Sequence, residues 1–250
     1  MVLLAAAAAL YGVTASSAFV LAPDGLVVHG AVHADEATVR HVLGLDDAAH
    51  PNLFSLDTGR LVEALRRLPS VDAARSDAVV IRVTLPDRLI VELRERMPIL
   101  IWEVGTRRFL VDVDGVLLAQ VDEAQTPGLP VIADARSAAA GLQVGGQLER
   151  VDLAAARRVG AVTPAMLGSA AAYLSVEVGD DEGFVLVPDA SSWRAVFGIY
   201  TSHLRSPDLV AAQVQCLASL LRGQEASVAV AYLFPEGGQC GTFAARPRAP

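Results

Sequence analysis

The sequence contains no lysine, and all 20 of its basic residues are arginine. These arginines are scattered along the chain, and the net charge is −8. A protein that binds nucleic acid through the phosphate backbone needs a basic patch or stripe. The sequence therefore argues against nucleic acid as a partner. Codon bias explains the missing lysine better than selection for arginine does.

Short catalytic motifs are also missing. The sequence has no GxSxG, no HExxH, no phosphate-binding loop and no dinucleotide fingerprint. The stretch Asp112-Val113-Asp114-Gly115 resembles the start of a calcium loop but lacks the later acidic ligands, so we predict a turn there. Four of the five histidines lie between residues 29 and 50, with spacings that match no zinc pattern. We therefore expect no catalytic residue, metal, cofactor or small-molecule substrate.

Cysteine is nearly absent: the chain has Cys216 and Cys240 only, and they form no metal-binding pattern. If this part of the chain is exported, a disulfide between them is one alternative. Two unpaired, buried thiols are the other. A bridge requires a short distance between the two residues, which the sequence does not supply.

The first 22 residues carry no charged side chain. About 20 consecutive apolar residues can span the ~30 Å hydrocarbon core of a membrane as a helix, so we predict a transmembrane helix over residues 1–22. No basic residue precedes it to set its orientation. The alternatives are a cleaved signal peptide, because small residues near Ala18 and Ala22 resemble cleavage sites, and a buried helix. The anchor and the signal peptide would both export the rest of the chain.

Residues 23–95 show the pattern of a small α+β domain. A strand is expected at residues 26–30 and helices at 34–45 and 55–68, the second ending at Pro69, because the residue before proline is pushed out of the α region. From residue 78 the apolar period changes to 2, which predicts two strands joined by a turn at Leu85-Pro86. The order strand, helix, helix, strand, strand predicts two helices on one face of a three-stranded sheet.

Residues 96–236 are richer in β patterns. We expect strands at residues 99–104, 107–121 (two strands about Asp114-Gly115), 129–134, 172–178, 183–189, 191–198 and 226–234. Helices are expected at residues 151–162 and 208–223. Residues 237–250 read as a loose tail. The prediction is a larger, mixed, β-rich domain with flanking helices.

Three stretches follow the hydrophobic segment in order: FSLDTGRLVEALRRLPSVDAA, RVTLPDRLIVELRERMPILIW and RRFLVDVDGVLL. In these stretches, over residues 1–121, the chain resembles the FtsQ/DivIB family of bacterial cell-division proteins. It implies a transmembrane helix (1–22), a POTRA domain (23–95), a β domain (96–236) and a C-terminal tail (237–250).

The same resemblance assigns structural roles to short motifs. A helix-to-strand joint is expected at Leu68 and Pro69, a hairpin turn at Leu85 and Pro86, the link between the two domains at Glu95, Arg96 and Pro98, and the first hairpin of the β domain at Asp114 and Gly115. Of these, Glu95 and Arg96 are the candidates for a further role, since a charged pair at a joint could fix the angle between domains.

The function that the resemblance implies is a non-enzymatic scaffold of the divisome, which helps control septal peptidoglycan synthesis. It would cross the cell membrane once, with the N-terminus in the cytoplasm and the C-terminal domains outside, at the division septum. Partners would be FtsB/FtsL-like bitopic proteins that add a β-strand to the edge at residues 227–234, with Val230, Tyr232 and Phe234 as contact residues. The alternatives are a POTRA-type module of a secretion or outer-membrane assembly system, and an exported enzyme.

Overall fold

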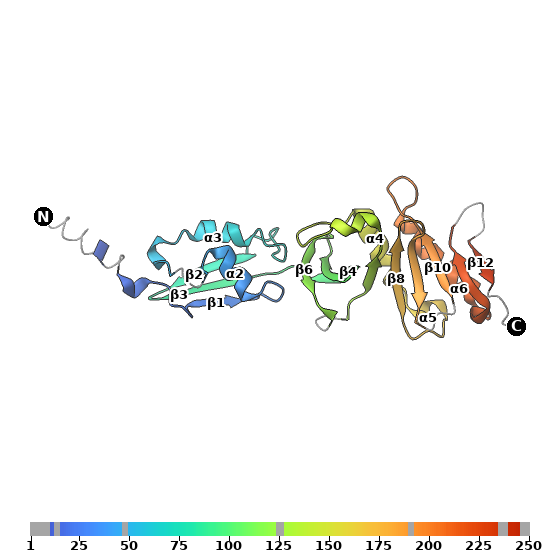
Figure 1. The fold of residues 1–250 in the computed structure, drawn as a ribbon, viewed down its shortest axis with the longest axis horizontal. Coiled ribbons are helices and arrows are strands. Elements are labelled where there is room, and N and C mark those ends of the chain that lie inside the picture. The colour runs from blue at the N-terminus through green and yellow to red at the C-terminus, as the bar shows by residue number, and fades with distance from the viewer. Residues whose placement is uncertain are drawn as a thin grey trace. The chain divides into compact units, whose positions relative to one another are not determined.

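The computed structural model describes residues 11–12, 16–46, 50–123, 128–189, 193–234 and 240–245. The chain divides into two compact units, Met1–Met97 and Pro98–Pro250 (Figure 1). Helices and strands are mixed in both units, and the predicted α+β class is confirmed. The division falls close to the boundary that the sequence predicts at residue 95.

The first unit follows the predicted order of strand, helix, helix, strand, strand. Its elements are β1 (Leu26–His29), α2 (Glu36–Leu43), α3 (Thr58–Leu65), β2 (Val79–Thr84) and β3 (Arg88–Leu93), with 3₁₀ turns η1 (Ser17–Phe19) and η2 (Leu53–Ser55). In the sheet, β3 lies in the middle, parallel to β1 and antiparallel to β2. Residues of both helices and all three strands form one core, which includes Leu26, Val39, Leu43, Leu65, Val79, Leu89 and Val91.

Helix α3 begins at an aspartate cap and ends earlier than the sequence predicts. The Asp57 side chain accepts the backbone N–H of Arg60 at 3.0 Å, as an N-cap residue does. The helix ends at Leu65, and the N–H of Leu68 then bonds the carbonyl of Leu65 at 3.1 Å in a tighter turn. The prediction that the helix runs to Pro69 is therefore wrong: the proline follows a turn, which already leads the chain out of the helix.

The second Leu-Pro pair lies in the turn between β2 and β3. Thr84 and Arg88 are the last paired residues of this antiparallel ladder, and the Leu85-Pro86 peptide bond between them is cis. The predicted hairpin turn is confirmed.

The predicted membrane helix falls mostly on residues 1–10 and 13–15, which lie outside the described residues. Its described end is not a continuous helix, because Ser16 is extended and Val20 forms a bridge with Asn52. Leu21 is buried in the core of the first unit, so the fold of this unit begins before the predicted boundary at residue 22. Within the part of the chain that the structure describes, no helix has the length and apolar character needed to cross a membrane.

The second unit is built on a nine-stranded sheet with the order β12-β11-β10-β9-β8-β7-β4-β5-β6. Its strands are β4 (Pro98–Val104), β5 (Arg107–Asp112), β6 (Leu117–Val121), β7 (Val131–Asp134), β8 (Leu174–Gly179), β9 (Gly183–Pro188), β10 (Arg194–Gly198), β11 (Val228–Tyr232) and β12 (Thr242–Ala245). The pairs β4–β7, β7–β8 and β10–β11 are parallel, and the other pairs are antiparallel.

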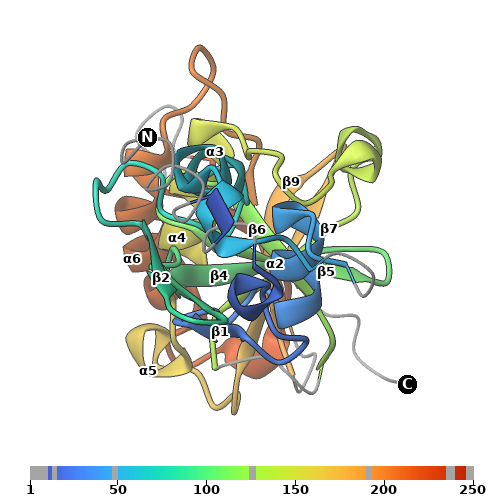
Figure 2. The ribbon, with the colours of Figure 1, turned by 90° about the vertical axis from the view of Figure 1, so that its left-hand side faces the viewer.

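Helices cover the main core of this sheet. They are α4 (Arg150–Val159), α5 (Pro164–Leu167) and α6 (Val210–Leu221), with 3₁₀ turns η4 (Ser137–Gly141), η5 (Pro207–Leu209) and η6 (Glu225–Ser227). Helices α4 and α6 contact each other, as Figure 2 shows. Their apolar side chains join those of the strands, among them Trp102, Phe109, Phe184 and Phe197. Side chains alternate between sheet faces, so Ile101, between Leu100 and Trp102, belongs to a smaller cluster on the opposite face.

The turn between β5 and β6 lies where the sequence predicts it. The buried carboxylate of Asp112 accepts the N–H groups of Asp114 at 3.0 Å and Val116 at 2.8 Å. Gly115 has a φ of +84°, a conformation that favours glycine. The aspartate and the glycine of this motif therefore shape a turn.

Candidate docking edge

The large sheet has β12 at one edge and β6 at the other. The sequence predicts a loose tail over residues 237–250, and that prediction is wrong for Thr242–Ala245, which pair antiparallel with β11. All four of these side chains are exposed. An edge strand presents unpaired N–H and C=O groups along one side, which an added strand can pair with.

The predicted docking strand, β11, is not at the edge. It lies between β10, to which it is parallel, and β12, to which it is antiparallel. Val230 lies opposite Ala244, and Tyr232 lies opposite Thr242. The chain itself therefore occupies the side of β11 that the sequence predicts to be open, and in the described part of the sheet the edge lies one strand further out, at β12.

Aromatic side chains gather at the end of β11. The rings of Tyr232 and Phe234 stack with centroids 6.1 Å apart, and Phe234 is 39% exposed. The guanidinium of Arg205 lies 4.9 Å above the Phe234 ring and donates to the carbonyl oxygen of Phe197 at 2.9 Å. The predicted contact residues Tyr232 and Phe234 thus lie together, with a cation next to them, and aromatic residues are frequent anchors of interfaces.

A buried glutamine on α6 holds the ends of two neighbouring strands. The side chain of Gln213 is 1% exposed and donates to the carbonyl oxygens of Phe197 at 2.8 Å and Leu233 at 2.5 Å. Its own oxygen accepts the hydroxyl of Tyr200 at 2.6 Å. Burial raises the pKa of Tyr200 above its ordinary value, which keeps this hydroxyl protonated and able to donate. The amide therefore has its donors and its acceptor in use.

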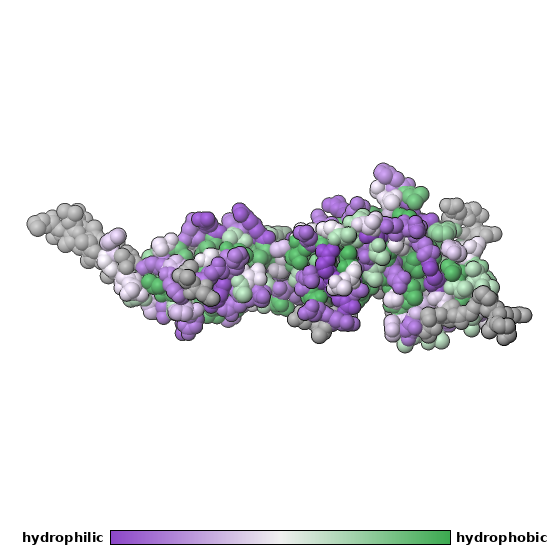
Figure 3. All heavy atoms as spheres, in the orientation of Figure 1, coloured by the Kyte–Doolittle hydropathy of each residue, from purple (hydrophilic) through white to green (hydrophobic). Residues whose placement is uncertain are grey.

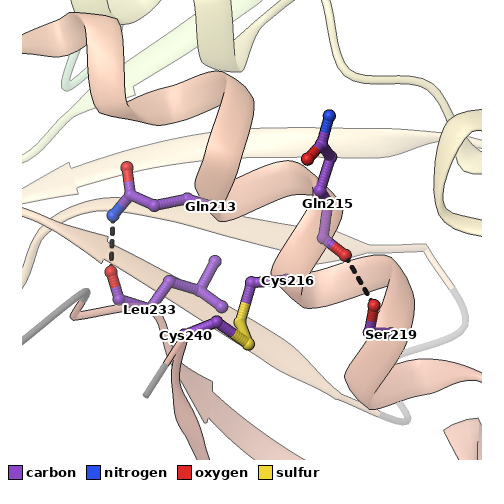
Figure 4. The surroundings of a disulfide bond; sticks show 6 residues. All are labelled: Gln213, Gln215, Cys216, Ser219, Leu233 and Cys240. Carbon is purple, nitrogen blue, oxygen red and sulfur yellow. Dashed lines mark hydrogen bonds between the residues drawn. A yellow bond between two sulfur atoms is a disulfide. The ribbon is translucent and has the colours of Figure 1, made fainter. Parts of the chain in front are cut away.

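The two cysteines form a disulfide between α6 and a residue two positions before β12. The Cα atoms of Cys216 and Cys240 are 5.5 Å apart, within the usual range for a bridge. Cys216 is buried in the core, and Cys240 is exposed. Figure 4 shows this bridge beside the bond between Gln213 and Leu233.

The residues expected at the domain joint bind within the first unit. The Glu95 carboxylate accepts three successive backbone N–H groups, those of residues 32, 33 and 34, at 2.8, 2.7 and 2.9 Å. Arg96 donates its backbone N–H to Ser70 at 2.7 Å and its side-chain Nε to the carbonyl of Val71 at 3.3 Å. Both residues thus tie the end of the first unit to its own backbone. Pro98 is the first residue of β4.

Two further polar clusters are structural. Asp134 accepts from Trp102 Nε1 at 3.1 Å and from Arg136, which also pairs with Asp152 at 2.8 Å. Burial opposes the charge of Arg136, but the hydrogen bonds to both aspartates raise its pKa. Every charged group here has a partner of opposite sign. Because Trp102, Asp134 and Asp152 come from β4, β7 and α4, the cluster joins these three elements.

Glu225 forms the second cluster. It accepts from the Ser169 hydroxyl, from Trp193 Nε1 at 2.8 Å and from the Ala170 N–H at 3.1 Å. Burial works against its ionisation, yet these three donors lower its pKa. In these clusters and in the rest of the described residues, no group of three His, Cys, Asp or Glu side chains could hold a metal ion. On the face that Figure 3 shows, hydrophilic side chains are spread over both units.

Sequence reasoning missed Gln213, Arg205 and β12. A signal existed for the glutamine, because it lies on the face of α6 that carries Val210, Val214 and Leu217, where a polar residue is unexpected. No comparable signal marks Arg205. The strand β12 has four residues with every side chain exposed, so it lacks the apolar alternation by which strands are recognised.

Two curated proteins are similar to this chain. It is 32% identical over 130 residues to the cell division protein FtsQ of Agrobacterium fabrum, over 51% of this chain and 39% of that protein. It is 32% identical over 95 residues to the cell division protein FtsQ of Koribacter versatilis, over 38% of this chain and 25% of that protein. The matches therefore span well under half of the length of these relatives. No family model matches the chain.

Proposed function

We propose that this chain is a member of the FtsQ/DivIB family and serves as a scaffold of the bacterial divisome. The similarity to proteins named for cell division carries the proposal. The first unit supports it, because its order of strand, helix, helix, strand, strand is the order expected of the family's POTRA domain. The role we propose is recognition of other division proteins, without catalysis.

The proposed place of action is the division septum. The hydrophobic stretch that precedes Ser16 would contribute the membrane anchor, because Val20 and Leu21 belong to the first unit, and both units would lie outside the cytoplasm. A disulfide in the second unit fits that placement, since such bonds persist in oxidising compartments. In this arrangement the second unit is available to the extracytoplasmic segments of FtsB/FtsL-like partners.

We propose β12 as the docking edge, in place of β11. It is one of the two edge strands of the sheet, its side chains are exposed, and Tyr232 and Phe234 lie at the end of the neighbouring strand. An extended segment of the partner would pair with the outer side of β12, so that backbone hydrogen bonds supply affinity and nearby side chains supply specificity.

Imaging a fluorescent fusion during depletion of the native protein tests the cellular role. Localisation at midcell, with filamentous cells after depletion, is the expected result. Uniform staining of the envelope with normal division would reject the scaffold role and favour a secretion or assembly module.

Two truncations test the docking edge. Deleting residues 242–250 removes β12 and leaves β11 outermost, with both cysteines retained. Deleting residues 246–250 keeps β12 and is the matched control. Binding is measured with a labelled peptide from the extracytoplasmic part of the organism's own FtsB-type protein. We expect the longer deletion to abolish binding and the shorter one to preserve it. Equal or stronger binding after the longer deletion would show that the partner pairs with β11.

A further inference from the structure

One face of α6 fixes both ends of the segment that joins β11 to β12. Gln213 and Cys216 are three residues apart, so their side chains lie on the same side of the helix. The glutamine donates to Leu233, directly after β11, and the cysteine is bonded to Cys240, shortly before β12 (Figure 4). We call Gln213, Cys216 and Cys240 the α6 clamp.

The chain passes closely between the helix and β11 as it enters β12. A Cβ atom at Gly241 would lie 2.7 Å from the carbonyl oxygen of Tyr232 and 3.1 Å from the sulfur of Cys216. Only glycine fits this approach without displacing its neighbours. The path into β12 is therefore set by contacts to both α6 and β11.

Little else holds β12. It has four residues, all with exposed side chains, and among the described strands it pairs with β11 alone. Burial of apolar surface is the main stabilising contribution in folded proteins, and strands that pair without a packed face are marginal. The ladder to β11 by itself is thus a weak attachment, whereas Cys216 is embedded in the core.

We propose that the α6 clamp consists of positioning residues for the docking edge, and that partner docking requires the intact disulfide. This inference rests on the proposed function. When a dithiol reduces the bridge, the S–S bond breaks, each sulfur gains one electron and one proton, and the dithiol closes into its own disulfide. The strand β12 then separates from β11, while α6 stays in place through its apolar face.

Amide hydrogen exchange with and without dithiothreitol tests whether the disulfide of the α6 clamp positions β12. Cys216 and Cys240 are the only cysteines, so the reagent has one target in the chain. We expect exchange in residues 228–232 and 242–245 to rise by roughly tenfold or more on reduction. Exchange in β8, β9 and α6 should stay unchanged.

The Cys240→Ala variant provides the control. Its substitution is at an exposed position, and the variant should show the raised exchange without any reagent and no further change when dithiothreitol is added. Unchanged exchange in both experiments would overturn the proposal. A general rise that includes β8, β9 and α6 would also overturn it, because the bridge would then stabilise the whole unit.

Binding of the FtsB-type peptide to wild-type protein and to Cys240→Ala tests the functional half. We expect the variant to bind at least about tenfold more weakly. Raised exchange with equal binding would overturn the link between clamp and docking. If the wild-type protein does not bind the peptide, the proposed docking edge fails, and the exchange experiment still decides whether the clamp positions β12.

Discussion

In each unit, one side chain holds backbone segments by hydrogen bonds, and we call this set of bonds the tie of that unit. The two ties differ in whether the side chain only accepts or also donates. In the first unit, the Glu95 carboxylate accepts three N–H groups from residues 32–34. In the second unit, the Gln213 amide donates to the carbonyls of Phe197 and Leu233 and accepts from Tyr200. A carboxylate can only accept, and an amide can do both. Glu95 therefore suits a run of N–H groups, and Gln213 suits a site that offers two carbonyl oxygens and one hydroxyl.

The two ties also differ in burial. Gln213 is buried, whereas two of the three bonds to Glu95 are partly buried and one is exposed. Water can replace a lost partner at an exposed group, but a buried group that loses its partner keeps the full cost of desolvation. The tie in the second unit should therefore contribute more to stability. Both tryptophans, Trp102 and Trp193, lie in the second unit, so tryptophan fluorescence reports on that unit alone.

Among the variants that test this comparison, Gln213→Leu should lower the unfolding free energy the most. The carbonyl of Leu233 and the hydroxyl of Tyr200 lose this partner, while Phe197 keeps its bond from Arg205. Two buried groups without partners cost about 2–4 kcal/mol of unfolding free energy. Urea denaturation followed by tryptophan fluorescence measures the loss.

The matched control is Gln215→Leu on the same helix. Its side chain is exposed and points away from the strands (Figure 4), so the change should stay within about 0.5 kcal/mol. If both variants lose equal stability, leucine itself disturbs α6, and the buried amide has no special role.

Replacing Glu95 by alanine should have the second largest effect, and in the other unit. Three charge-assisted bonds are lost, which should lower the unfolding free energy of the first unit by about 1–3 kcal/mol. Circular dichroism, which sees both units, should show an earlier transition. The transition seen by tryptophan fluorescence should not move.

The control for this prediction is Glu63→Ala, an exposed position on α3, which should leave both transitions unchanged. A shift of the fluorescence transition in Glu95→Ala would show that the tie supports the second unit as well. The comparison between two separate ties would then be wrong.

Separation along the sequence explains which of these contacts the sequence predicts. In the first unit, Asp57 and Pro86 act on residues within a few positions of themselves, so the cap and the turn are readable from short stretches. The bonds of Glu95 span about sixty positions, and those of Gln213 to Leu233 span twenty. Neither distance is encoded in a local pattern. The edge strand β12 is not readable from sequence either, because its four side chains are all exposed and its pairing with β11 leaves no local pattern.

Acid should weaken the second unit through Glu225, with the smallest of the three effects. Its donors lower the pKa of the folded carboxyl below the ordinary value of 4.5. Its contribution to stability is therefore present above that value and is lost as the pH falls through the lower, folded value. The unfolding free energy from tryptophan fluorescence should fall as the pH drops below 4.5, and less steeply in Glu225→Gln. Glutamine keeps an acceptor for Trp193 but cannot ionise. The variant therefore distinguishes the contribution of the charge from that of the hydrogen bond. Parallel curves for the two proteins would show that other carboxylates cause the whole acid response.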